Sequence, residues 1–187
     1  CTYLVSALQI NLRDQDYFKK LSEKKVNAIA FEFIVDEYRQ LSLVRLIGEI
    51  AGNVAVLYAA ELLALSNGLM LGGITGVRPT EVVILGAGIV GEFATKAALG
   101  LGASVKVFDN SLSKLRRLHM MVDGRVPTSI IDPKELNKSL KRADVVIGAF
   151  SKYSAFPVIT KEMVMGMKKG SVIIDVTIDN SNVIETS

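Results

Sequence analysis

Three glycines in the middle of the chain are spaced as a dinucleotide-binding turn requires. The segment reads EVVILGAGIVG, so a G-x-G-x-x-G pattern follows directly on an apolar run. We expect Gly86 to allow a tight turn, Gly88 to let a pyrophosphate approach the backbone, and Gly91 to let the next helix pack closely. The first amides of that helix, at Ile89 and Val90, would then face the phosphates. Such a motif alone is weak evidence, and a packing turn in another α/β fold is the alternative.

An acidic residue follows the glycine turn at the distance expected of a ribose ligand. The run SVKVF is followed by Asp109, eighteen residues after Gly91. A carboxylate in that place can accept hydrogen bonds from the adenosine ribose and would repel the additional phosphate of NADP. We therefore expect the cofactor to be NAD, with Asn110 beside it. Basic residues on the next helix leave NADP open, and Asp109 is alternatively the cap of a helix beginning near Leu112.

Two further apolar runs end in residues that would border the same cleft. The run ADVVIGA ends at Gly148 and Ala149, with Phe150 next, and the run SVIIDV is followed by a turn that contains Asp179. Ligands of open α/β sheets bind outside the carboxyl ends of the strands. These residues are therefore candidates for the cleft, although Gly148 is equally typical of an ordinary turn and Asp179, in a polar segment, is more typical of a turn than of a site.

The elements that must position these residues alternate between short apolar runs and helical segments. Strands that are apolar throughout are typical of a parallel sheet with helices on both faces. The fold class is therefore α/β, with a Rossmann-type doubly wound parallel sheet. The predicted strands span residues 82–85, 105–108, 125–131, 145–147 and 172–176, and the predicted helices span residues 89–101, 112–121, 133–141 and 160–167.

A long helix is predicted before this region. From Leu41 to Leu65 apolar residues recur at intervals of three and four, which gives a helix of roughly 37 Å at about 1.5 Å per residue. Its polar residues Asn53 and Glu61 favour a buried or interface helix over a membrane span. Its exposed apolar face would mark a subunit contact, so we expect a homo-oligomer. Residues 3–10 and 26–34 are predicted strands, and a glycine-rich connector covers residues 68–79.

Composition excludes several classes of protein. The 22 basic and 19 acidic residues give a net charge of +3 without like-charge blocks, so we expect neither nucleic-acid nor membrane binding. One cysteine, Cys1, excludes an internal disulfide and a zinc cluster, and no secretory signal is visible. The single histidine, His119, is interpreted as a surface or packing residue, and no metal site is expected. Both ends of the sequence look like cuts in a longer chain.

Several phrases resemble a known family when taken together. The segments LGGITGVRP, VVILGAGIVG, KAALGLGASVKVFD, KRADVVIGA and MKKGSVIIDVTID occur in the order found in the alanine dehydrogenase / NAD(P) transhydrogenase NAD-binding subunit family, and the resemblance runs over about residues 49–187. It implies a cytoplasmic, multi-subunit enzyme that oxidises L-alanine with NAD to pyruvate and ammonia, so the small-molecule partner is an amino acid or 2-oxo acid. An NAD(H)-binding transhydrogenase subunit and a non-enzymatic NAD-sensing module are the alternatives.

The resemblance also assigns roles to residues. It implies an adenosine-side contact at Lys114, cofactor contacts at Phe150 and Ser151, and an active-site aspartate at Asp179. The family's catalytic histidine has no counterpart in residues 4–12, and its substrate-binding lysine and arginine would precede Cys1. Residues 1–40 are then a remnant of a substrate domain, residues 41–80 a linking helix and connector, and residues 81–187 a Rossmann NAD-binding domain. The candidate cofactor-binding residues are Gly86, Gly88, Ile89, Val90, Gly91, Asp109, Asn110, Lys114, Gly148, Ala149, Phe150, Ser151 and Ile178, and the candidate catalytic residue is Asp179.

Overall fold

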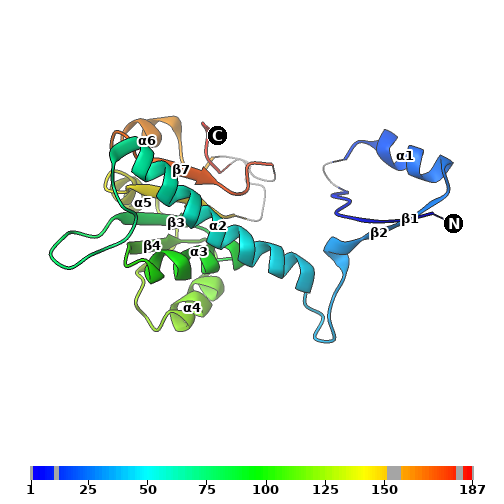
Figure 1. Ribbon diagram of the computed structural model, residues 1–187, viewed down its shortest axis with the longest axis horizontal. Helices are drawn as coiled ribbons and strands as arrows, with labels where there is room; N and C mark the ends of the chain where they lie inside the picture. The colour runs from blue at the N-terminus through cyan, green and yellow to red at the C-terminus, as the bar shows by residue number, and fades with distance from the viewer. Residues whose placement is uncertain (1, 11–12, 151–156, 180–182, 187) are drawn as a thin grey trace. The chain divides into compact units, whose positions relative to one another are not determined.

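The computed structural model describes residues 2–10, 13–150, 157–179 and 183–186 (Figure 1). The chain divides into two compact units, Cys1–Ile47 and Gly48–Ser187. The candidate cofactor residues all belong to the second unit.

The first unit is built on a small parallel sheet. Strand β1 (Thr2–Ser6) pairs with β2 (Val26–Ala30), and helix α1 (Gln15–Glu23) connects them. Both strands are shorter than the apolar runs predict. A 3-10 turn, η1 (Phe31–Phe33), follows β2, and its Glu32 carboxylate accepts hydrogen bonds from the amides of Leu8 at 3.1 Å and Gln9 at 2.7 Å. These side-chain bonds, together with a left-handed φ of 47° at Gln9, end the extended run.

The second unit contains a five-stranded parallel sheet with the strand order β5-β4-β3-β6-β7. This order confirms the predicted doubly wound α/β fold. After helix α2 (Ser42–Asn67), the elements are β3 (Glu81–Leu85), α3 (Ile89–Gly100), β4 (Ser104–Phe108), α4 (Leu112–Met121), β5 (Thr128–Ser129), α5 (Pro133–Leu140), β6 (Val145–Gly148), α6 (Lys161–Met165) and β7 (Val172–Asp175).

Edge strand β5 is much shorter than the run 125–131 predicts. Pro127 precedes it and has no backbone N–H, although its carbonyl accepts a 3.0 Å hydrogen bond from Val107 in β4. Only two residues of β5 then pair with β4. A short edge strand limits the row of unpaired backbone groups that the sheet exposes.

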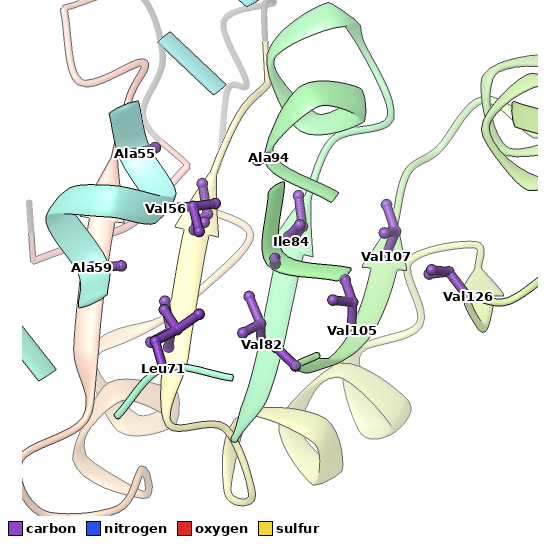
Figure 2. Close-up of a cluster of buried hydrophobic side chains, with 14 of the residues drawn as sticks. Ala55, Val56, Ala59, Leu71, Val82, Ile84, Ala94, Val105, Val107 and Val126 are labelled. Atoms are coloured by element: carbon purple, nitrogen blue, oxygen red, sulfur yellow. The ribbon is translucent and has the colours of Figure 1, made fainter. Parts of the chain in front are cut away.

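Side chains alternate between two core layers, one on each face of the sheet. Val82 and Ile84 of β3 point to the layer covered by α2, α3 and α4, while Val83 and Leu85 point to the layer covered by α5 and α6. Figure 2 shows the first layer, in which Val56 and Ala59 of α2 lie over the strands. The central strands β3 and β6, whose carboxyl ends carry the candidate site, are buried on both faces over nearly their whole length.

Helix α2 packs on α3 through residues without bulky side chains. A Cβ atom added to Gly52 would lie 2.4 Å from the carbonyl oxygen of Val90, and one added to Gly48 would lie 3.1 Å from Cγ2 of Ile89. Glycine at Gly52 is therefore required for the backbones of the two helices to approach. At its other end, α2 is fixed by Ser66, whose hydroxyl donates a 2.8 Å hydrogen bond to the carbonyl of Gly170.

Helix α2 also keeps an exposed apolar face. By length and composition it is the one helix among the described residues that could cross a membrane, with a mean hydropathy of 1.5. Core helices of soluble proteins pass the same test, and α2 contributes four residues to the first core layer. The exposed apolar residues of its second-unit part are Ile50, Val54, Leu57, Tyr58, Leu62 and Leu65.

Candidate functional site

The strand order creates a crevice at the carboxyl ends of β3 and β6. The chain leaves β3 toward β4 on one side, and β6 returns on the other side of β3, so the connections diverge at this point. Such a switch point is the usual ligand site of an open α/β sheet. Gly86 directly follows β3, and Gly148 is the last residue of β6.

The three glycines of the turn differ in what surrounds them. Gly86 has a left-handed φ of 108°, and a Cβ atom there would lie 2.6 Å from the carbonyl oxygen of Ala149. At Gly91 a Cβ atom would lie 1.8 Å from the carbonyl oxygen of Gly86, so α3 contacts the turn backbone to backbone. A Cβ atom at Gly88 would meet nothing within 4 Å. Two of the glycines therefore serve close packing, and the third borders open space.

Helix α3 begins at the turn without a side-chain cap. Its N-cap is Gly88, which has an extended backbone conformation, so no side chain at the N-cap accepts a hydrogen bond from the first amides of the helix. The half-buried residues Ile89 and Val90 form the first positions of the helix. The unpaired amides and the positive dipole end of a helix N-terminus attract anions. A phosphate group placed beside Gly88 would meet both the unpaired amides and the positive end of the helix dipole.

Asp109 is tied into the glycine turn. Its side chain is buried, with the residue 3% exposed, and Oδ2 accepts a 2.7 Å hydrogen bond from the amide of Ala87. Oδ1 accepts a 2.7 Å hydrogen bond from the amide of Ser111. A carboxylate has about four acceptor positions, so roughly two stay available for ribose hydroxyls. The alternative interpretation of Asp109 as a helix cap is wrong, because Ser111 is the N-cap of α4.

The neighbouring candidates lie around this carboxylate. Asn110 is exposed directly after Asp109, and Lys114 is half-buried on the first turn of α4. The hydroxyl of Ser111 accepts a 3.4 Å hydrogen bond from the Lys114 amide, which fixes the start of the helix. The exposed His119 lies farther along α4 and lines a shallow hollow of about 680 Å³ beside β5. His119 therefore belongs to the surface, as the sequence predicts.

A buried carboxylate on α3 was not singled out by the sequence motifs. Glu92, the residue after the last glycine, is 1% exposed in its side chain and pairs with Lys96 at 3.0 Å and with Arg117 of α4 at 3.8 Å. Nη2 of Arg117 also donates a 3.4 Å hydrogen bond to the carbonyl oxygen of Ala87. The i,i+4 spacing of Glu92 and Lys96 is visible in the sequence, but nothing local indicates that Arg117 joins them.

The ends of β6 and β7 form the other side of the crevice. Gly148 and Ala149 are buried, and the Ala149 amide donates a 2.8 Å hydrogen bond to the Leu85 carbonyl. A Cβ atom at Gly148 would lie 3.3 Å from Oδ1 of Asp175, so this glycine leaves room for a carboxylate of β7. Phe150 is half-buried against the second core layer. Ser151 lies outside the described residues.

Asp179 and Ile178 lie on the turn after β7, and both are exposed. Oδ1 of Asp175 accepts hydrogen bonds from the amide of Thr177 at 3.0 Å and from its hydroxyl at 3.2 Å, so Asp175 organises this turn. A hollow of about 340 Å³ next to it is lined in part by Asp175 and Ile184. Asp175 is a residue that the motif analysis missed, because its role depends on the turn geometry.

Other groups of charges do not belong to this site. A hollow of about 240 Å³ lies at the amino-terminal edge of the sheet, opposite the strand ends that carry the glycine turn. Two ion pairs lie at it: Lys106 contacts Glu135 at 2.6 Å, and Arg142 contacts Glu81 at 2.9 Å. Across the part of the chain that the structure describes, no three His, Cys, Asp or Glu side chains are grouped to hold a metal ion.

Comparison with known proteins identifies the family. Residues 55–187 match the family model described as "Alanine dehydrogenase/PNT, C-terminal domain". An alanine dehydrogenase from Methanococcus maripaludis is 38% identical over 173 residues, which is 90% of this chain and 46% of that protein. "Alanine dehydrogenase 2" from Staphylococcus aureus is 38% identical over 172 residues, which is 46% of its length. The chain therefore spans about half the length of the curated relatives it matches.

Solved structures agree with this assignment. An L-alanine dehydrogenase has a TM-score of 0.89 and 33% sequence identity over 98% of this chain and 52% of its own. A transhydrogenase from Sinorhizobium meliloti shares the fold at a TM-score of 0.76 and 19% identity, over 99% of this chain and 56% of its own. The matched region contains β3 to β7 and the whole crevice described above. The chain belongs to the alanine dehydrogenase/PNT C-terminal domain family.

Proposed function

We propose that this chain forms the NAD(H)-binding half of an NAD-dependent amino-acid dehydrogenase of the alanine dehydrogenase type. The observation that carries the proposal is the glycine turn whose Ala87 amide is bonded to the buried carboxylate of Asp109. The open space at Gly88 fits a pyrophosphate, and the remaining acceptor positions of Asp109 fit the two hydroxyls of the adenosine ribose. The family match supports the same cofactor class.

The Asp109 carboxylate favours NAD over NADP. A 2′-phosphate would be placed beside a buried negative charge that is already committed to two backbone amides. A like charge in such a place costs free energy, because burial lowers the effective dielectric constant. We therefore expect NADH to bind more tightly than NADPH.

In the proposed reaction, NAD would supply the acceptor for the hydride that leaves the α-carbon of the amino acid. This chain would hold the pyrophosphate at Gly88 and the first turn of α3, and the adenosine ribose at Asp109. Asp179 stands on the turn after β7 and is proposed to orient the substrate near the nicotinamide. The family resemblance supports this role for Asp179, and the bonds of Asp175 to Thr177 support its placement on an ordered turn.

The NAD(H)-binding subunit of a transhydrogenase is the second candidate. It is favoured by the segment 4–12, which contains Gln9 and no histidine. The two candidates differ in the hydride donor and acceptor. A full-length protein that forms NADH from NAD and L-alanine supports the dehydrogenase, whereas hydride transfer between NADH and an NADP analogue on a partner protein supports the second candidate.

We also propose that the exposed apolar face of α2 contacts a second copy of the chain. Five of its large apolar residues between Ile50 and Leu65 are at least 46% exposed, and a contiguous face of this kind usually marks an interface. Replacing Leu57 and Leu65 with glutamine should lower the molecular mass measured by analytical ultracentrifugation. An unchanged mass would contradict this assignment.

Calorimetric titration with NADH and with NADPH tests the cofactor proposal. We expect wild-type protein to prefer NADH, and Asp109→Asn to lower that preference by about tenfold, because the variant keeps one acceptor oxygen and loses the charge. Lys138→Gln, on α5 at the opposite edge of the sheet, is the control. Equal affinity of the wild-type protein for both cofactors would exclude Asp109 as the selecting residue.

A further inference from the structure

The buried carboxylate of Glu92 has no place in the cofactor contacts proposed so far. It lies in the first turn of α3, the helix whose N-terminus would receive the pyrophosphate. A negative charge in that turn repels an anionic ligand, so a chain that binds NAD there needs a reason to keep it. The contacts of Glu92 with Lys96 and Arg117 supply that reason.

Arg117 connects Glu92 to the glycine turn. Its guanidinium lies 3.8 Å from Oε2 of Glu92 and donates a 3.4 Å hydrogen bond to the carbonyl oxygen of Ala87. The Arg117 side chain is 47% exposed, whereas that of Glu92 is 1% exposed. A half-exposed arginine is ordinarily free to choose among rotamers, so the buried Glu92 carboxylate is what keeps it on the turn.

Ala87 is consequently held on both sides. Its amide donates to Oδ2 of Asp109 at 2.7 Å, and its carbonyl accepts from Arg117. That carbonyl belongs to the same peptide unit as the Gly88 amide. A trans peptide directs its C=O and N–H to opposite sides. Fixing the carbonyl on Arg117 therefore directs the Gly88 amide away from α4, at the residue that borders open space.

We infer that Glu92 and Arg117 are positioning residues that set the orientation of the Ala87–Gly88 peptide for pyrophosphate binding. The inference rests on the proposed NAD(H) function. Neither residue is proposed to touch the cofactor: Glu92 holds Arg117, and Arg117 holds the turn. Lys96 balances the second oxygen of the Glu92 carboxylate at 3.0 Å.

The sign of the Glu92→Gln effect separates positioning from simple charge. NADH carries negative charge on its pyrophosphate, so loss of a nearby carboxylate should tighten binding if charge alone matters. Positioning predicts the opposite, a loss of about five- to tenfold in NADH affinity, because Arg117 is released from the turn. Arg117→Met should cause a similar loss. Arg117→Lys should not restore binding, because an ammonium does not reproduce the planar guanidinium that reaches both the Glu92 carboxylate and the Ala87 carbonyl oxygen.

The experiment combines calorimetric NADH titration with amide hydrogen exchange of the protein without ligand. Arg116→Met is the control, since it removes the same charge from the next residue of α4. We expect the Ala87 and Gly88 amides to exchange faster in Glu92→Gln and Arg117→Met than in Arg116→Met and wild-type protein. The double variant should lose no more affinity than either single variant, because both act through one contact.

The outcomes also separate this inference from the proposed function. If wild-type protein fails to bind NADH, the proposed function fails, and amide exchange in the Glu92→Gln, Arg117→Met and Arg116→Met variants still decides whether Arg117 holds the turn. Tighter NADH binding by Glu92→Gln, or unchanged exchange in Arg117→Met, overturns the inference. Arg117→Met changes a half-exposed side chain and is therefore expected to fold. Its NADH affinity and amide exchange test the inference even if Glu92→Gln is too unstable to study.

Discussion

Replacing Gly88 or Gly91 with alanine should separate cofactor binding from stability. At Gly88 the added methyl meets nothing within 4 Å, and the backbone, at φ −77° and ψ −168°, suits any residue. Loss of a glycine N-cap costs up to about 1 kcal/mol, and lower freedom of the unfolded chain offsets about 0.4–1 kcal/mol of this. We therefore expect the free energy of unfolding to change by about 0.5 kcal/mol or less, because the two effects nearly cancel.

The same methyl should interfere with the cofactor. It would stand in the open space beside the α3 N-terminus, where the proposed pyrophosphate must approach the backbone. We expect Gly88→Ala to weaken NADH binding by at least about tenfold, or about 1.4 kcal/mol. This variant would be folded normally and defective in binding alone.

Gly91→Ala should instead unfold the site. Its methyl would lie 1.8 Å from the Gly86 carbonyl oxygen, so α3 and the turn must separate by roughly 1 Å or more to remove the overlap. Both sides of the contact are backbone, and no side chain can rotate to relieve it. Overpacking costs about 1–3 kcal/mol, and we expect the upper end of that range. For a chain of this size the melting temperature should fall by about 6–12 °C.

Urea unfolding and NADH titration on the same preparations test both expectations. Gly100→Ala is the control: it ends α3, its methyl meets nothing within 4 Å, and it should raise stability by about 0.5 kcal/mol with NADH binding unchanged. Wild-type NADH affinity in Gly88→Ala would refute the placement of the pyrophosphate. A wild-type urea midpoint in Gly91→Ala would refute the backbone contact between α3 and the turn.

Three further predictions concern the second unit. Burial raises the pKa of Glu81, but hydrogen bonds from Arg142 and Arg78 outweigh burial and hold that pKa below its ordinary value near 4.5. The resulting stabilisation is complete at neutral pH and is lost as the pH falls below about 4.5, so urea midpoints at pH 7 and pH 3.5 should differ less in Glu81→Gln than in wild-type protein; an equal difference would contradict the reasoning. Asp175→Ala should speed amide exchange at Thr177 and cost about 1 kcal/mol, because two hydrogen bonds to the turn are lost; wild-type exchange would count against an organising role. Gly52→Ala should lower the free energy of unfolding by about 2–3 kcal/mol, since its methyl would lie 2.4 Å from the Val90 carbonyl; an unchanged thermal midpoint would show that α2 and α3 are not in backbone contact.

The β3-α3-β4 segment could be predicted from the sequence because its signals are local. Apolar runs, three glycines and a following acid all lie within about thirty residues, and in that order they predict a strand, a glycine turn, a helix and a second strand that ends at the acid. The predicted helix 112–121 matches α4 in the structure. The contact of Arg117 with Glu92 could not be predicted, because it joins residues 25 positions apart through tertiary packing.

Hydrophobicity alone predicted strands that were too long. The runs 3–10 and 26–34 are apolar beyond Ser6 and Ala30, yet the strands end there because Glu32 bonds the amides of the neighbouring loop. For Asp109 the sequence predicted a role but not all of its contacts. Its place after β4 indicated a ribose ligand, but no local signal predicts that the same carboxylate accepts a hydrogen bond from the Ala87 amide.

The contact of Gly52 with Val90 places α2 directly on the first turn of α3. One side of that turn faces the proposed cofactor, and α2 carries the apolar face proposed for a second copy. A shift of α2 on assembly would therefore be transmitted to the amides that receive the pyrophosphate. Thermodynamic linkage makes such coupling reciprocal: if assembly changes cofactor affinity by some factor, cofactor binding changes assembly affinity by the same factor. If α2 carries the proposed subunit contact, the close approach at Gly52 would link quaternary structure and cofactor occupancy in a single equilibrium.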